Sequence, residues 1–185
     1  ALMMHGFLHL FTREVINMPH LSAMPNGVAG MTLDWHLDAK EAQAPTNKLI
    51  KLNVFNDPKA LFSIEMTAGP DAVVPKDALG WNLPANKTAQ QFLQTFAKTG
   101  HAVGSHGGWI HDWYGSRVSE TNRLGSTSGG CINSVIRVDN FEQCLVLNRQ
   151  SVDGVLGRAS VSYSAPEGNN PLWAMDWLEQ RGVVA

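Results

Sequence analysis

The sequence predicts an α/β fold with a largely parallel sheet. Runs of strand type alternate with runs of helix type through most of the chain, and this alternation is typical of βαβ units. The length of 185 residues fits one domain, and 44% hydrophobic with 16% charged residues is typical of a globular protein. No segment of about 20 to 50 residues repeats, so solenoids and propellers are not expected.

The first half of the chain contains three expected strands and one expected helix. The β-prone run 30–35 is the first strand, and 61–68, which ends at Gly69 and Pro70, is the second. Asn86 is expected to cap a helix whose apolar residues keep the spacing of one face, with Gly100 as its stop. Residues 101–106 then form the third strand.

A second helix is expected to follow a loop at 115–130 that is rich in Gly, Ser, Thr and Asn. Asp139 or Asn140 opens this helix, and Gly154 or Gly157 marks its end. Asn148 is a polar interruption of its apolar face. The pattern therefore predicts an amphipathic helix whose apolar face contains one polar side chain, that of Asn148.

The chain is expected to end with a strand at 160–165 and a third helix. Asn170 and Pro171 form a cap and first-turn pair for that helix, and Gly182 stops it. Residues 1–27, marked only by a turn, are interpreted as an N-terminal extension, and 28–185 as the α/β domain. About five strands are expected in total, where a closed (β/α) barrel needs about eight.

Composition excludes several classes of partner. Fourteen Lys and Arg against sixteen Asp and Glu give a net charge of −2, so no basic field is expected to bind nucleic acid or an anionic membrane. No apolar run approaches the roughly 18 residues of a membrane span. Cys131 and Cys144 are too few for a disulfide framework or a four-thiolate zinc site. They either form one disulfide or remain two buried thiols, so the cysteines do not indicate the cellular compartment.

Histidines cluster just after the third expected strand. His106 and His111 are separated by a segment with two glycines, which lets the backbone fold so that both rings meet. Two imidazoles and a carboxylate are a common ligand set for a catalytic metal, and Asp34 and Asp38, after the first strand, are the candidate carboxylates. Alternatively, the histidines cap helices or lie in the core, and Asp38 caps a helix that begins near Ala39.

Aromatic residues lie beside these histidines. Trp109 and Trp113 either stack on the flat faces of sugar rings or belong to the core. Phosphate-binding loops of the Gly-Lys-Ser type, Gly-x-Ser-x-Gly elbows and His-Glu-x-x-His helices do not occur. Nucleotide hydrolysis, serine-esterase chemistry and zincin proteolysis therefore lose their usual support.

Four segments between residues 30 and 168 resemble the polysaccharide deacetylase family. Segment 100–106 (GHAVGSH), with His111 after it, resembles the second motif, in which two histidines bind the metal. Segment 62–69 (FSIEMTAG) resembles the strand before it, 31–34 (MTLD) the first motif, and 163–168 (YSAPEG) the third. The resemblance implies a partial or distorted (β/α) barrel that is incomplete at its C-terminus.

The resemblance also implies a function, namely metal-dependent hydrolysis of N-acetyl groups on sugars. It implies a divalent cation, expected to be zinc, bound by His106, His111 and a carboxylate, Asp38 or Asp34. Asp34 and Asp38 are the candidate catalytic carboxylates, one as base and the other as metal ligand, and Trp109, Trp113 and Pro166 are the expected carbohydrate contacts.

The sequence also departs from the family pattern. The two acids are not adjacent here, Ser164 stands where the family has Arg, and the later motifs are absent. The alternative is therefore a non-catalytic relative that binds carbohydrate or metal. An open barrel also has exposed strand edges, which favour homo-oligomers.

Overall fold

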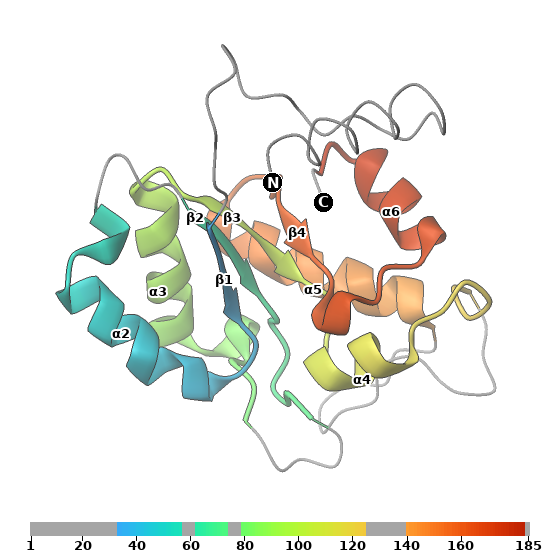
Figure 1. Cartoon of the computed structure of the whole chain (residues 1–185), viewed down its shortest axis with the longest axis horizontal. Helices are drawn as coiled ribbons and strands as arrows, with labels where there is room; N and C mark the ends of the chain where they lie inside the picture. Colours follow the sequence, from blue (N-terminus) through green and yellow to red (C-terminus); the bar gives the residue numbers. More distant parts are fainter. Residues whose placement is uncertain (1–32, 57–61, 74–78, 125–139, 184–185) are drawn as a thin grey trace, which may run out of the picture. The chain divides into compact units, whose positions relative to one another are not determined.

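Four parallel strands form a curled sheet, a half-barrel, in the computed structural model (Figure 1). The structure describes residues 33–56, 62–73, 79–124 and 140–183. The strands are β1 (Leu33–Leu37), β2 (Phe62–Met66), β3 (Ala102–His106) and β4 (Tyr163–Ser164), and their order in the sheet is their order in the sequence. All three pairings are parallel. This sequential order is the one that curls a parallel sheet toward a barrel.

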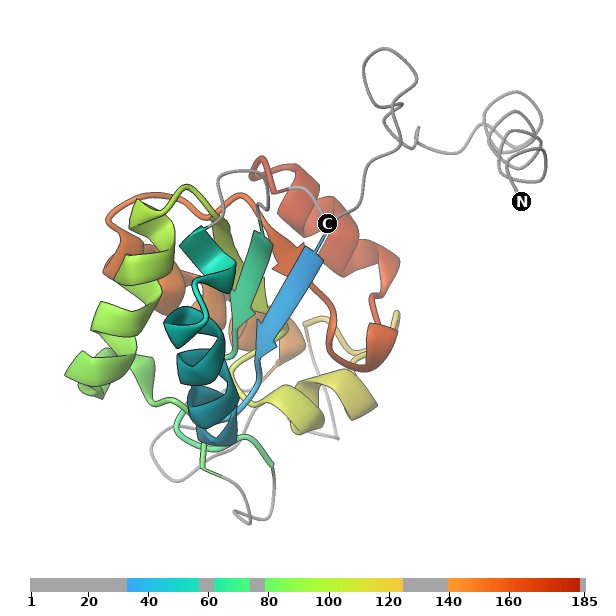
Figure 2. The ribbon, with the colours of Figure 1, turned by 60° about the vertical axis from the view of Figure 1, so that its left-hand side comes forward.

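Helices α2 (Gln43–Lys51), α3 (Lys87–Lys98) and α5 (Phe141–Leu156) pack on one face of the sheet (Figures 1 and 2). Trp35 of β1 donates from its indole N–H to the Thr46 hydroxyl of α2 at 3.0 Å, and α3 and α5 both contact β3. Helices α4 (His111–Arg117) and α6 (Leu172–Glu179) follow β3 and β4 respectively. Helices α2, α3, α4 and α5 therefore lie in the connections between parallel strands, as βαβ units require, and α6 follows the last strand.

Local capping signals set the helix ends. The Asn86 side chain accepts from the Ala89 amide and begins α3, and the Asn140 side chain accepts from the Gln143 amide and begins α5. Gly157 ends α5 in the left-handed conformation, with φ of 67°. These boundaries confirm the expected helices, because each depends on side chains within a few residues of the helix end.

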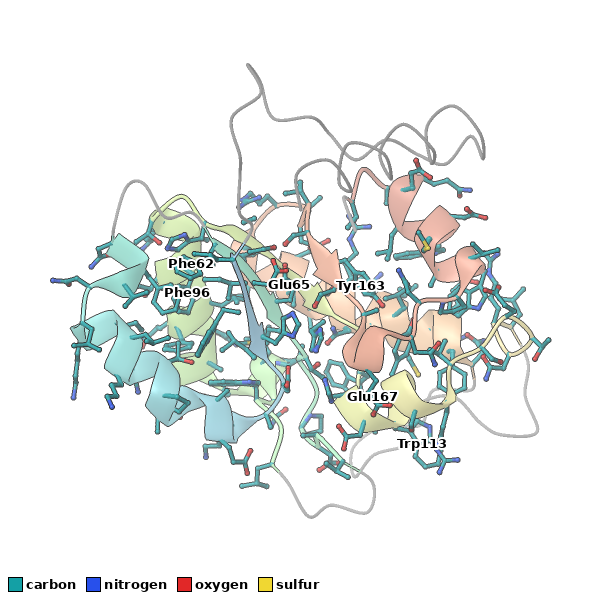
Figure 3. The ribbon with its side chains drawn as sticks, viewed as in Figure 1. Phe62, Glu65, Phe96, Trp113, Tyr163 and Glu167 are labelled. Atoms are coloured by element: carbon teal, nitrogen blue, oxygen red, sulfur yellow. The ribbon has the colours of Figure 1, made fainter. Side chains whose placement is uncertain are left out.

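An aromatic cluster fills the space between the sheet and helix α3. The Phe55 ring meets those of Phe62 and Phe96 edge to face, with centroids 4.8 Å apart in both pairs; Figure 3 labels Phe62 and Phe96 in this region. The buried His101 ring joins them, with Nε2 2.7 Å from the Phe55 carbonyl. His101, one of the clustered histidines, is therefore a core residue.

Several sequence-based expectations differ from the structure. The described residues form four strands rather than about five, and His111–Arg117 is helical, so the long loop begins later than 115. The N-cap of the 3₁₀ turn η3 (Lys40–Ala42) is Ala39, which makes no side-chain cap bond, so Asp38 does not cap it. The N-cap of α6 is Pro171, again without a side-chain bond, so Asn170 does not cap it.

Some expectations concern residues outside the described ranges. The proposed N-terminal extension 1–27 and the start of the first expected strand lie there. Cys144 is buried and disulfide-bonded, and Cys131 lies outside the described residues. Within the described part of the chain, no helix combines the length and the apolar character needed to cross a bilayer.

The face of the sheet opposite α2 and α3 carries polar residues. Side chains alternate between the faces of a strand, and the register aligns His36 with Glu65 and Glu65 with Gly104. One step closer to the carboxyl ends, His106 is paired with Ser164. This inner face of the half-barrel therefore holds the residues with titratable side chains, in successive layers.

Candidate metal centre

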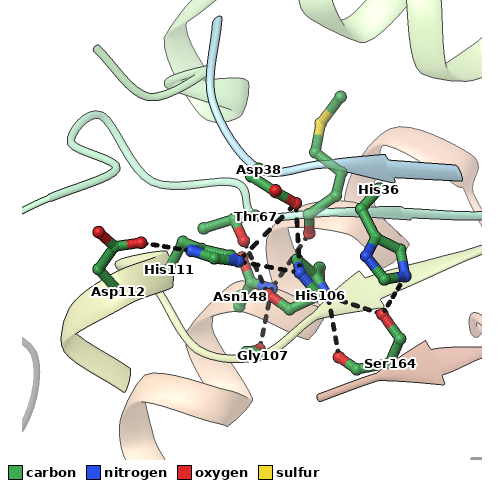
Figure 4. Close-up of polar contacts among 10 residues, drawn as sticks. His36, Asp38, Thr67, His106, Gly107, His111, Asp112, Asn148 and Ser164 are labelled. Atoms are coloured by element: carbon green, nitrogen blue, oxygen red, sulfur yellow. Dashed lines mark hydrogen bonds and ion pairs between the residues drawn. The ribbon is translucent and has the colours of Figure 1, made fainter. Parts of the chain in front are cut away.

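Three side chains meet at the carboxyl end of the sheet, beside β1 and β3 (Figure 4). Asp38 directly follows β1, His106 is the last residue of β3, and His111 is the first residue of α4. Nε2 of His106 lies 3.0 Å from Nε2 of His111 and 3.2 Å from Oδ1 of Asp38, and Nε2 of His111 lies 3.8 Å from the same oxygen. We call these three residues the His–Asp cluster.

The turn after β3 brings the two imidazoles together. Gly107 has a φ of 61°, a left-handed conformation that favours glycine. A Cβ atom on Gly107 would lie 2.2 Å from Cγ of Pro166, and one on Gly108 would lie 2.3 Å from the Tyr114 ring. The glycines therefore permit both the backbone path and the close packing that return His111 to His106.

The outer ring nitrogens of both histidines have hydrogen-bond partners. Nδ1 of His111 lies 2.6 Å from Oδ1 of Asp112, and Nδ1 of His106 lies 3.0 Å from the Ser164 carbonyl oxygen and 2.6 Å from its hydroxyl. Carboxylate and carbonyl oxygens only accept hydrogen bonds, so this network assigns the proton to Nδ1 in each ring. Each Nε2 lone pair then faces the cluster, the arrangement found in metal-ligating histidines.

The cluster fits a small divalent cation. Oδ1 of Asp38 is buried and, among the described residues, makes no hydrogen bond of normal geometry, although it contacts Nε2 of His106. Three acceptor atoms that face one another repel one another unless a cation or a proton lies between them. Tetrahedral zinc with bonds near 2.1 Å places ligand atoms roughly 3.4 Å apart, and the three separations of 3.0, 3.2 and 3.8 Å lie around that value.

His36 is a third imidazole beside the cluster, and sequence reasoning did not assign it a role. Its ring stacks on that of His106 with centroids 4.3 Å apart, and Nε2 lies 3.1 Å from the Ser164 hydroxyl. Ligand atoms of His36, Asp38 and His106 all lie within 4.8 Å of one another, so this His–Asp–His group could also hold a metal ion. The sequence feature that could have identified His36 is its position two residues before Asp38, because residues i and i+2 of an extended segment point to the same face.

Burial and neighbouring charges set the protonation of the cluster. Burial raises the pKa of Asp38, but the close contact with His106 and the charges of His106 and His111 outweigh it, so the pKa lies below its ordinary value. Burial lowers the pKa of His36, and the His106 charge adds to that effect. Near neutral pH, Asp38 is therefore anionic and His36 neutral, the forms that bind metals.

Asp34, the other candidate acid, lies away from the His–Asp cluster. It is exposed on β1, on the same face as His36 but two residues further from the carboxyl end. Its register partner is Ser63 of β2, and no contact places it with His106 or His111. A different carboxyl group, Glu65 of β2, lies buried on this inner face, and the sequence did not single it out.

The three predicted carbohydrate contacts lie in different surroundings. Trp109 is 4% exposed and belongs to the hydrophobic core. Pro166 is buried and lies against Gly107 and Gly115. Trp113 is half-buried on α4, with the Arg117 guanidinium 3.7 Å from its ring centroid. Of the three, Trp113 alone is not buried, and the prediction that they bind carbohydrate stays a prediction.

Comparisons with known proteins identify no family. The sequence matches no protein-family model and no curated protein, and the structure matches no solved structure. The geometry of the site and the motifs in the sequence therefore carry the functional proposal.

Proposed function

We propose that this protein is a metal-dependent hydrolase that removes acetyl groups from N-acetylated sugars. The observation that carries the proposal is the convergence of Nε2 of His106, Nε2 of His111 and the buried Oδ1 of Asp38. The resemblance of 100–111 to the second motif of polysaccharide deacetylases supports the choice of reaction. Zinc is the proposed metal, because imidazole and carboxylate ligands suit it.

The chain's own residues bind and orient the cation in this proposal. His106, His111 and Asp38 supply one atom each, and Asp112 and Ser164 hold the two rings through their Nδ1 atoms. A divalent cation bound there supplies a water of lowered pKa and polarises an acyl carbonyl group. Three protein ligands leave a position open for water and substrate, as catalytic sites require.

The proton acceptor in this proposal is Asp38 rather than Asp34. Oδ1 of Asp38 faces the cluster and is buried, but the side chain as a whole is 46% exposed, so its second oxygen is accessible. Asp34 lies further from the carboxyl end of β1. Asp38 therefore combines contact with the cluster and access to solvent, which a group that accepts a proton from water needs.

A second candidate function is metal or carbohydrate binding without catalysis. The observation that favours it is the position of Ser164, which stands where the family has Arg. The Ser164 hydroxyl is occupied by His106 and His36, at 2.6 and 3.1 Å, rather than being directed to a substrate. A site of this kind would bind its ligand and release no acetate.

Metal analysis of the purified protein tests the first step. We expect stoichiometric divalent metal in the wild type and its loss in Asp38→Asn and His106→Ala. Asp176→Asn is the matched control, because Asp176 is an exposed acid on α6. A wild-type protein that takes up no stoichiometric zinc or cobalt at neutral pH would overturn the proposal.

Acetate release from acetylated chito-oligosaccharides tests the second step. Release that a chelator abolishes, and that zinc restores, supports the hydrolase. Stoichiometric metal with no acetate release, together with oligosaccharide binding in calorimetry, supports the non-catalytic alternative and refutes the hydrolase. The Asp176→Asn control is expected to behave as the wild type in both assays.

A further inference from the structure

Asn148 is a buried amide that reaches the backbone at the carboxyl ends of β2 and β3. It lies on the apolar face of α5 and has no solvent exposure. Its Oδ1 accepts from the Ala68 amide at 2.6 Å. Its Nδ2 donates to the carbonyl oxygens of Met66, His106 and Gly107 at 3.2, 3.3 and 3.0 Å. Figure 4 shows this amide directly beneath the His–Asp cluster.

These four backbone groups lie where the sheet ends. Beyond the last residue of a strand, backbone groups lose their partners in the ladder, and buried ones must find others. The Thr67 hydroxyl also donates to the His106 carbonyl, at 2.8 Å. One side chain from a distant helix therefore ties together two strand ends that are about 40 residues apart in the sequence.

The number of hydrogen bonds that Asn148 makes shows that its amide suits these buried backbone groups. An amide NH₂ has two hydrogens, while three carbonyl oxygens lie within 3.3 Å of Nδ2 of Asn148, so one hydrogen is shared. A leucine of similar size would fill the same volume and leave these groups unsatisfied, at a cost for each buried group. The contacts are therefore specific to the amide and are not replaced by apolar packing.

We propose that Asn148 is a positioning residue of the His–Asp cluster, which fixes the backbone of His106 and Gly107 so that Nε2 of His106 faces Nε2 of His111 and Oδ1 of Asp38. This inference rests on the proposed metal function. The ring of His106 is held at two points, because Ser164 holds Nδ1 and Asn148 holds the main chain.

The path of the turn depends on the same contact. Gly107 is held by Asn148 on one side and by the Pro166 ring on the other, where a Cβ atom would be 2.2 Å from Cγ. The turn then continues to His111. The distance between the His106 and His111 rings therefore depends on where Asn148 and Pro166 hold the backbone of Gly107. Loss of the Asn148 contacts is therefore expected to change the relation of the two imidazoles, not only the stability of the fold.

The variants for the test are Asn148→Leu and Asn148→Asp, with Val152→Ala as control. Leu removes all four contacts. Asp keeps the acceptor for the Ala68 amide but loses the NH₂ donor, and it serves where Asn148→Leu does not fold. Val152 is fully buried on the same helix, so its truncation lowers stability without touching the cluster.

Cobalt binding at neutral pH is the first readout. We expect both Asn148 variants to bind Co²⁺ about 10 to 100-fold more weakly than the wild type, the usual effect of losing a group that orients a metal ligand. The visible absorption bands of the bound Co²⁺ are expected to shift as well. Val152→Ala is expected to keep the wild-type spectrum and affinity. Wild-type spectra and affinities in the Asn148 variants, or equal changes in Val152→Ala, would overturn the inference.

The ¹⁵N chemical shifts of the imidazoles in the metal-free protein are the second readout. We expect the His106 ring signals to change in the Asn148 variants and not in Val152→Ala. This measurement separates two failures. A wild type that binds no Co²⁺ refutes the proposed function, whereas unchanged His106 signals in the Asn148 variants refute the positioning role whether or not metal binds.

Discussion

Replacing Glu65 by Gln is expected to make the protein more stable at neutral and alkaline pH. Glu65 is 1% exposed on β2, and its Oε2 has no hydrogen-bond partner among the described residues; Figure 3 shows it among the strands. Burial raises the pKa of this carboxyl to about 7, and the Asp34 charge adds to that effect. The Ser63 hydroxyl, which donates to Oε1, and the nearby Ser162 hydroxyl oppose it only in part.

The sign follows from the protons bound in each state. The ordinary pKa of 4.5 applies to the unfolded chain and about 7 to the folded protein, so between these values the folded state binds more protons. The free energy of unfolding therefore falls as pH rises from about 4.5, and the full loss is present above pH 7. A difference of about 2.5 pKa units corresponds to a loss of about 3 kcal/mol. Glutamine carries no charge and removes this dependence.

Urea denaturation at pH 4.5, 6, 7 and 8 measures the effect. We expect Glu65→Gln to be within about 1 kcal/mol of the wild type at pH 4.5, the scale of one altered hydrogen bond, and more stable by up to about 3 kcal/mol at pH 8. Glu179→Gln at the exposed end of α6 is the control and is expected to show no such trend. A stability difference between Glu65→Gln and wild type that stays constant from pH 4.5 to 8 would refute the reasoning.

Four further predictions concern one helix cap, two glycines and the cluster. Asn86→Ala removes the acceptor that caps α3 and is expected to lower the free energy of unfolding by about 1 kcal/mol in urea denaturation. Gly104→Ala places a Cβ atom 1.8 Å from the Ser162 carbonyl oxygen, and we expect it to cost about 2 kcal/mol or more by forcing β3 and β4 apart. Gly154→Ala meets no atom within 4 Å on α5 and is expected to raise stability by about 0.5 to 1 kcal/mol; equal effects of the two glycine variants would contradict both. Zinc affinity, measured by competition with a chromogenic chelator, is expected to be lower at pH 5 than at pH 7.5, because metal-ligating imidazoles must be deprotonated. A pH-independent affinity would argue against histidine ligation.

Helices α3 and α5 and their ends were predictable because the causes are local, whereas α4 partly overlaps the expected loop and Asn170 does not cap α6. Asn86 and Asn140 cap helices through contacts within three residues, and Gly157 ends one through its own backbone conformation. The parallel sheet followed from the alternation of strand and helix signals. Its curling into a half-barrel agrees with the expected partial barrel, whereas the specific deacetylase type stays a prediction.

The sequence could not decide which polar side chains share a space. In the sequence, Asp38 could be either a helix N-cap or a metal ligand. Only the structure shows that it makes no cap bond and lies beside His106. His101 and His106 looked alike in one motif, yet one is packed among phenylalanines and the other faces a carboxylate. The difference arises because Ala102–His106 alternates its side chains between the two faces of the sheet and His101 precedes it.

By itself, the sequence determined the alternation of strands and helices, the caps of α3 and α5 and the segment that holds two nearby imidazoles, since all of these depend on neighbours in the chain. Only the tertiary structure decided that Glu65 is buried, that His36 stacks on His106 and that Asn148 joins two strand ends. Those properties depend on which strands lie side by side and which helix packs behind them, and residues 80 positions apart, such as Ala68 and Asn148, meet only when the whole sheet has formed.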